Sequence, residues 1–168
     1  MKKYLSNLSF SVIMDIIDQK LLEMLQTDCK QTTKAMASRL HLSVTAVYER
    51  VKKLEQQGVV TNYVAVLDKN KVGKGFVVFC HLKLVQHSKN NIAVFERRVA
   101  ELPEVLECHH VSGDYDYILK IVVRDMDEYR LFLVNKLTAL EQIGSTHSTF
   151  VISEVKYSNV VVLWFFLK

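Results

Sequence analysis

Residues 43–57, SVTAVYERVKKLEQQ, constrain the fold of this chain most, because they predict one amphipathic helix with a defined beginning and end. Ser43 is a residue type that caps helix N-termini, and Gly58 is a natural C-terminal stop. The apolar positions recur at i, i+4 and i+7 and are Val47, Val51 and Leu54. The other faces carry hydroxyl and cationic side chains, which favours either the major groove of DNA or a solvated surface helix.

The residues before this helix predict two shorter helices. One begins at Asp15, whose charge suits the positive end of the helix dipole, and the other is capped by Thr32. The dipeptide His41-Leu42 is then a tight connection into the helix at Ser43. Two helices joined by about three residues, the second carrying cations, are typical of a helix-turn-helix. The β-branched residues 59–67 that follow predict a strand pair or wing.

The second half of the chain alternates strands and helices in the order βαββαβ, after a polar candidate linker at residues 68–75. The expected strands are 76–85, 104–111, 117–123 and 148–156, and the expected helices are 90–102 and the segment that Asp125 and Glu128 begin. The fold class is therefore α+β, with an N-terminal winged helix-turn-helix and a C-terminal ferredoxin-like βαββαβ sandwich. The bare face of such a sheet is expected to bind a second copy of the chain.

The formal net charge of +4 is unevenly distributed along the chain. Residues 1–75 carry +5 and residues 76–168 carry −1, as expected for a polyanion-binding half joined to a neutral half. Three cysteines without a CxxC motif argue against a disulfide framework and favour a reducing cytoplasm. The apolar run at residues 160–167 is far short of the roughly 20 residues that a transmembrane helix needs, so no membrane segment is expected.

Four segments, in this order and spacing, resemble the Lrp/AsnC (feast/famine) family of transcriptional regulators. They are residues 15–22 (DIIDQKLL), 42–55 (LSVTAVYERVKKLE), 58–60 (GVV) and 113–120 (GDYDYILK). The resemblance implies binding to double-stranded DNA as a homodimer or octamer, and a C-terminal sensing module, the RAM domain, that binds amino acids between dimers. The expected organisation is an extension at 1–14, a DNA-binding domain with its wing at 15–67, a linker at 68–75, a ligand-sensing and oligomerisation domain at 76–158 and an apolar tail at 159–168.

The resemblance divides the helix at residues 43–57 into base-contacting and phosphate-contacting positions. Residues 44–46 lie in the first turn, which would enter the groove first, and are expected at base edges. The cations from Arg50 onwards are expected at phosphates, which position a protein without specifying sequence. The full candidate set is Ser43, Val44, Thr45, Ala46, Glu49, Arg50, Lys52 and Lys53.

Two positions depart from the family pattern. His41 stands in a turn that usually has glycine, and histidine tolerates a positive φ better than a branched residue does. Glu49 stands where the family often has a cation, and it either weakens phosphate affinity or accepts a hydrogen bond from a cytosine N4 amine. Tyr48 is expected to pack half-buried beside Val47, with stacking on DNA as the alternative.

The resemblance also implies an effector pocket around the loop at residues 113–116 and the stretch at 146–149. The candidate residues are Gly113, Asp114, Tyr115, Asp116, Thr146, Ser148 and Thr149. A carboxylate and free backbone N–H groups suit the α-ammonium and α-carboxylate of an amino acid. The alternative is an ordinary hairpin turn, for which Gly and Asp are common residues.

No catalytic constellation or phosphate loop is present in the sequence, so neither an enzyme nor a cofactor is expected. Cys80-His81 and residues 108–110 (CHH) suggest a metal, but neighbouring residues of a strand point to opposite faces, and packing is the preferred interpretation. The leading hypothesis is a cytoplasmic, amino-acid-responsive DNA-binding regulator. The alternatives are an effector-independent regulator or DNA-compacting protein, and a small-molecule-binding or enzymatic sandwich domain with a protein-contacting N-terminal half.

Overall fold

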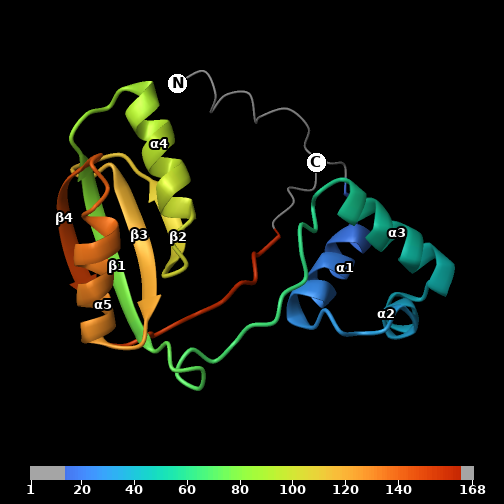
Figure 1. Cartoon of the computed structure of the whole chain (residues 1–168). Helices are drawn as coiled ribbons and strands as arrows, with labels where there is room; N and C mark the ends of the chain where they lie inside the picture. The colour runs from blue at the N-terminus through green and yellow to red at the C-terminus, as the bar shows by residue number, and fades with distance from the viewer. Residues whose placement is uncertain (1–13, 164–168) are drawn as a thin grey trace. The chain divides into compact units, whose positions relative to one another are not determined.

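The computed structural model describes residues 14–163, which divide into two compact units. One unit contains residues 14–65 and 156–163, and the other spans Val66–Val155 (Figure 1). The expected extension at 1–14, apart from Met14, lies outside the described residues, as does the last part of the expected tail. Within residues 14–163, no helix has the length and hydropathy needed to cross a bilayer.

The first unit is built from three helices, each of which begins at a capping side chain. The helices are α1 (Ile16–Thr27), α2 (Thr33–Leu40) and α3 (Val44–Gln56), with Asp15, Thr32 and Ser43 as their N-caps. Each cap accepts a hydrogen bond from the backbone N–H three residues later, which satisfies an otherwise unpaired donor. The buried core of the unit joins all three helices and contains Leu21, Leu25, Met36, Ala37 and Val47.

The turn between α2 and α3 confirms the predicted helix-turn-helix. His41 ends α2 in the left-handed conformation, with φ of 56°, and the Leu42 N–H donates to the Ala37 carbonyl at 3.0 Å. Gly58 ends α3 with φ of 69°, while the Val59 N–H reaches back to the Leu54 carbonyl at 2.9 Å. The start and the stop of α3 are therefore both fixed by local chemistry.

The predicted wing is wrong for the described chain, because no residue from 61 to 67 lies in a strand. The side chains of Val64 and Leu67 are 65% and 64% exposed. β-branched residues form a strand only where a neighbour pairs with their backbone and one face is buried, and this stretch has neither. The first unit therefore has the three helices of the helix-turn-helix, followed by a segment without helix or strand in place of the predicted wing.

Residues 68–75 form a folded turn within the second unit instead of a linker. The Asp68 carboxylate accepts from the Asn70 N–H at 3.0 Å, and the Lys74 N–H donates to the Lys69 carbonyl at 2.8 Å. The boundary between the units falls earlier, after Ala65.

The second unit has the predicted ferredoxin-like fold. Its elements are β1 (Phe76–Leu84), α4 (Lys89–Ala100), β2 (Val105–His110), β3 (Tyr117–Val123), α5 (Met126–Phe132), the π-helical turn η2 (Leu133–Leu137) and β4 (Ile143–Phe150). The four strands form one antiparallel sheet in the order β2-β3-β1-β4 (Figure 1). Strands β1 and β2 are separated by β3, as the βαββαβ order predicts.

The fourth strand begins and ends earlier than the predicted 148–156. It pairs with β1 from Ile143 to Phe150, and Ile152 beyond it is fully exposed. The β-branched residues after 150 favoured a strand there, but the pairing with β1 selects the polar stretch at residues 144–149. The chain then returns to the first unit, where Val161 exchanges two hydrogen bonds with the Gln26 side chain.

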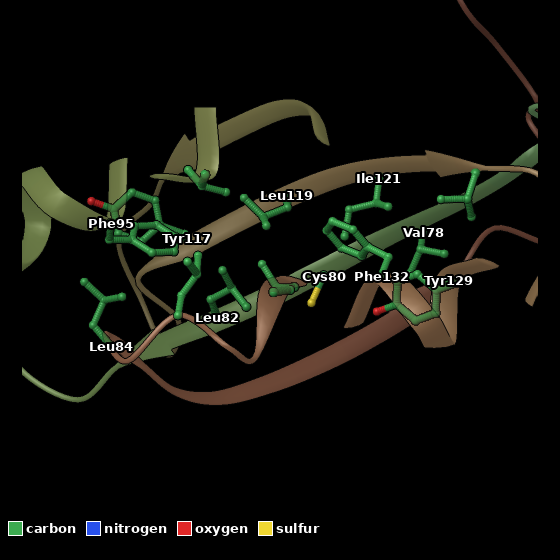
Figure 2. Close-up of a cluster of buried hydrophobic side chains, with 14 residues drawn as sticks. Val78, Cys80, Leu82, Leu84, Phe95, Tyr117, Leu119, Ile121, Tyr129 and Phe132 are labelled. Carbon is green, nitrogen blue, oxygen red and sulfur yellow. The ribbon is translucent and has the colours of Figure 1, made fainter. Parts of the chain in front are cut away.

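Alternate residues of the sheet meet α4 and α5 in one buried core, which Figure 2 shows. Its members include Val78, Cys80 and Leu82 of β1, Tyr117, Leu119 and Ile121 of β3, Phe95 of α4, and Tyr129 and Phe132 of α5. The intervening residues of the strands, such as Phe79, Ile118 and Val122, point to the opposite face. Within the unit that face is covered by neither α4 nor α5.

Candidate nucleic-acid interface

The exposed face of α3 has a mixed polar and aromatic surface. Thr45, Glu49, Lys52 and Gln56 follow one another at helical spacing, and all four are exposed. The buried residues of the helix, Val47 and Leu54, lie on the opposite side. A face of this kind offers hydrogen-bonding groups and a cation at the places where a helix in the major groove meets base edges and phosphates.

The first turn of α3 exposes only some of the residues expected at base edges. Ser43 uses its hydroxyl as the helix cap, accepting from the Ala46 N–H at 3.1 Å. Val44 is 48% exposed, Thr45 is exposed and Ala46 is half-buried. Val44 and Thr45 are therefore the more accessible side chains at the helix N-terminus.

Arg50 is held in an ion-pair cluster with α1. Its Nη1 atom lies 2.6 Å from a carboxylate oxygen of Asp18 and 2.7 Å from one of Asp15. The Arg50 side chain is 33% exposed, whereas Asp18 is buried. These carboxylates raise the pKa of Arg50, and the Asp18 N–H together with Arg50 lowers the pKa of Asp15. This geometry makes Arg50 a residue that positions α3, which differs from the phosphate contact that the sequence suggested.

Tyr48 is 53% exposed, so its expected half-buried packing is wrong. The Lys52 ammonium lies 5.8 Å from the centre of the Tyr48 ring, within the range of a cation–π contact. Lys53 is exposed one residue further on. The predicted DNA-contacting set did not include Gln56, and it did not include Tyr48, for which stacking on DNA was only the alternative interpretation; the helical spacing of both residues from Thr45 and Lys52 was a usable signal.

The loop at residues 113–116 does not present Asp116 as a free carboxylate. Its Oδ2 atom accepts a hydrogen bond from the Leu84 N–H at 2.8 Å, and its Oδ1 atom lies 2.8 Å from His87 Nε2. Partial burial opposes the ionisation of Asp116, but these two partners outweigh it and hold the pKa of Asp116 below its usual value. Asp116 therefore fastens the loop to the end of β1, while Gly113 takes a φ of 120° and Asp114 is exposed.

The remaining effector candidates fall on two sides of the sheet. The Ser148 hydroxyl lies 2.5 Å from the Tyr129 hydroxyl, on the side of the sheet that the helices cover. Thr146 lies two residues before Ser148 and therefore on the same side, whereas Thr149 lies on the opposite side. Tyr115 instead lies against the rings of His81 and His147, with centroid distances of 5.1 and 6.2 Å. Neither histidine was among the residues predicted for the effector pocket, and the pairing of β1 with β4 brings them together.

The cysteine and histidine segments do not converge. Cys80 is buried beside Tyr129 and Ser148, and its burial raises the pKa of the thiol. Between residues 14 and 163, no three side chains of the His, Cys, Asp or Glu type gather as they would around a metal ion.

A helix-turn-helix with an exposed, cation-bearing second helix, followed in the chain by a ferredoxin-like sandwich, defines the class of two-domain DNA-binding regulators. Residues 14–55 match the AsnC-type helix-turn-helix domain, and residues 77–161 match the Lrp/AsnC ligand binding domain. The chain belongs to the Lrp/AsnC family.

Three known proteins illustrate this relationship. The chain is 34% identical over 147 residues to the DNA-binding transcriptional activator DecR of Escherichia coli, covering 88% of this chain and 97% of that protein. It is 38% identical over 150 residues to the leucine-responsive regulatory protein of Haemophilus influenzae, covering 89% and 90% of the two chains. The structure of a Neisseria meningitidis transcriptional regulator in complex with L-Met superposes with a TM-score of 0.85 at 29% identity, covering 89% of this chain and 97% of that one.

Proposed function

We propose that this chain is a cytoplasmic, sequence-specific DNA-binding transcriptional regulator that places α3 in the major groove. The observation that carries the proposal is the exposed face of α3, held in position by its cap, by the turn at His41 and by the ion pairs of Arg50. The names of the relatives support the same function. The chain acts by binding and not by catalysis.

The surface of α3 divides between two tasks in this proposal. Val44, Thr45 and Tyr48 face the bases, because they are exposed towards the N-terminal part of the helix. Lys52 and Lys53 contact phosphates, because their flexible side chains carry point charges that need no fixed geometry. Ser43 and Ala46 contribute through the helix cap, and Arg50 keeps the helix in place.

A second copy of the chain covers the bare face of the sheet. Phe79, Ile118 and Val122 lie on that face among polar neighbours such as Lys120 and His81. A symmetric pair of sheets would remove these apolar side chains from water, and a dimer would present two copies of α3 to a palindromic operator. Octamers would add further contacts between dimers.

The second unit binds an amino acid that changes the DNA affinity of the assembly. The match to a ligand binding domain and the L-Met complex of the Neisseria meningitidis regulator support this role. The accessible candidates are Gly113, Asp114 and Tyr115 of the loop and Thr149 of β4, while Asp116 orders the loop. An effector of this kind alters DNA binding only by its different affinity for the free and the DNA-bound assemblies.

Selection of genomic fragments by the purified chain, with and without each of the twenty amino acids, tests the function. We expect a small set of fragments that share an inverted repeat, and a changed yield with at least one amino acid. No fragment enriched above the input would contradict DNA-specific binding. If the fragment yields are equal with and without every amino acid, and calorimetry detects no heat of amino-acid binding, the chain is an effector-independent regulator.

A further inference from the structure

We infer that Glu49 reads a cytosine in the operator by accepting a hydrogen bond from its N4 amine. The inference rests on the proposed binding of α3 to DNA and adds a specificity-determining residue to it. The observation behind it is a free carboxylate in the middle of the face that α3 exposes.

Glu49 lies one helical turn after Thr45 and one turn before Lys53 on α3, and its side chain is exposed. In the described part of the chain its carboxylate has neither a hydrogen bond nor an ion pair. The other acidic residues near α3 are engaged, since Asp15 and Asp18 bind Arg50 and Glu55 accepts from the Tyr63 hydroxyl. Glu49 is thus an acidic group on this surface that is left available for an outside partner.

The electrostatics of a DNA complex restrict where this carboxylate can be placed. Phosphates repel it, so a position beside the backbone would cost binding energy. Lys52 and Lys53 lie about one helical turn after Glu49 and can occupy the backbone positions themselves. The remaining place that stabilises a carboxylate is the floor of the major groove, where amine groups of the bases donate.

Two bases present an amine in the major groove, and their neighbouring atoms distinguish them. Adenine carries the N7 acceptor beside its own N6 amine, and this acceptor repels a carboxylate, whereas cytosine presents only its N4 amine in the major groove and has no acceptor of its own there. A carboxylate therefore favours cytosine, while an amide in the same position favours adenine because it can both donate and accept.

An intrahelical pair with Lys53 is the competing role for Glu49. The i, i+4 spacing permits such a pair, but no contact within 4.0 Å joins these two side chains in the structure. A pair within the helix would alter affinity for all sequences alike, whereas base recognition changes the preference at a single position. The two roles can therefore be separated by experiment.

The test is selection from a randomised duplex pool, followed by titration of single-position variants of the selected site in each half-site. Wild type, Glu49→Ala and Glu49→Gln are compared with Glu23→Gln, which removes the same charge from an exposed position of α1. We expect wild type to prefer one C·G pair by about 10- to 100-fold. Glu49→Ala should lose that preference alone, Glu49→Gln should shift it towards A·T, and Glu23→Gln should retain it.

Equal base preferences in wild type and Glu49→Ala would overturn the inference, even if overall affinity rises. Failure of the wild type to enrich any sequence would instead overturn the proposed DNA-binding function. Circular dichroism spectra of the variants check that α3 stays folded, which an exposed position on a capped helix should allow.

Discussion

The guanidinium of Arg50 in α3 lies 2.6 Å from the carboxylate of Asp18 in α1, and Asp18 is 5% exposed. This ion pair joins α3 to α1, the first helix of the domain. Asp18 also accepts from the Asp15 N–H, which completes the capping box of α1. One arginine therefore connects the start of α1 to the orientation of α3.

Replacement of Arg50 by alanine should destabilise the first unit. The buried Asp18 would lose its cationic partner, and an unsatisfied buried acceptor costs about 1–3 kcal/mol. Urea unfolding should show this loss for Arg50→Ala. The matched control is Lys53→Ala, an exposed cation of the same helix, which should change stability by less than about 0.5 kcal/mol. Equal midpoints for the two variants would contradict the positioning role.

The stability of the first unit should depend on pH through Asp15. The Asp18 N–H and Arg50 hold the pKa of Asp15 below its usual 3.8 in the folded chain, so the unfolded chain binds this proton more readily. The contribution of Asp15 is therefore complete above its unfolded pKa and is lost as the pH falls through the lower folded value. Urea midpoints between pH 7 and pH 3 should fall less steeply for Asp15→Asn, which keeps a capping side chain. Parallel curves would argue against this linkage.

The turn residue His41 should respond to substitution in two directions. Its φ of 56° costs an L-amino acid roughly 1–2 kcal/mol relative to glycine. His41→Gly should raise the unfolding free energy by up to about 1 kcal/mol, because the gain is partly offset by the flexibility of glycine in the unfolded chain. His41→Val, a branched residue, should lower it. Differential scanning calorimetry gives both shifts, and a loss of stability in His41→Gly would contradict the geometry.

A charge on the bare face of the sheet should break the proposed dimer. Val122 is half-buried, and it pairs with Val77 on that face. Val122→Lys would bury an unpaired ammonium between two copies and weaken association by more than about tenfold. Sedimentation velocity should show a smaller species, while Leu131→Lys on the outer side of α5 should keep the wild-type mass. A dimeric Val122→Lys variant would place the interface elsewhere.

The sequence predicted the elements that local chemistry decides. The caps at Thr32 and Ser43, the positive φ of His41 and the third strand from Tyr117 to Val123 all follow from short-range signals. The strand order also follows, because the βαββαβ pattern leaves few ways to build one sheet.

The features that the sequence did not predict depend on contacts between residues that lie far apart in the chain. The predicted wing is wrong because residues 59–67 have no strand to pair with among the residues that the structure describes. The fourth strand lies earlier in the chain than predicted because β1 pairs with residues 143–150. The ion pair of Arg50 depends on residues 32 and 35 positions away, although the i, i+3 spacing of Asp15 and Asp18 was visible. Contacts between distant segments carry no periodic signal in a single sequence.

The most direct test of DNA binding through α3 is the salt dependence of binding to a selected operator duplex, measured by fluorescence anisotropy from roughly 50 to 400 mM KCl. If α3 contacts phosphates through its lysines, the slope of log affinity against log salt should become shallower by about one for each lysine removed at Lys52 or Lys53 from each bound copy. Arg50→Lys, which keeps the charge of a positioning residue, should leave the slope unchanged. An unchanged slope in the Lys52→Ala and Lys53→Ala double variant would contradict the claim that α3 contacts DNA.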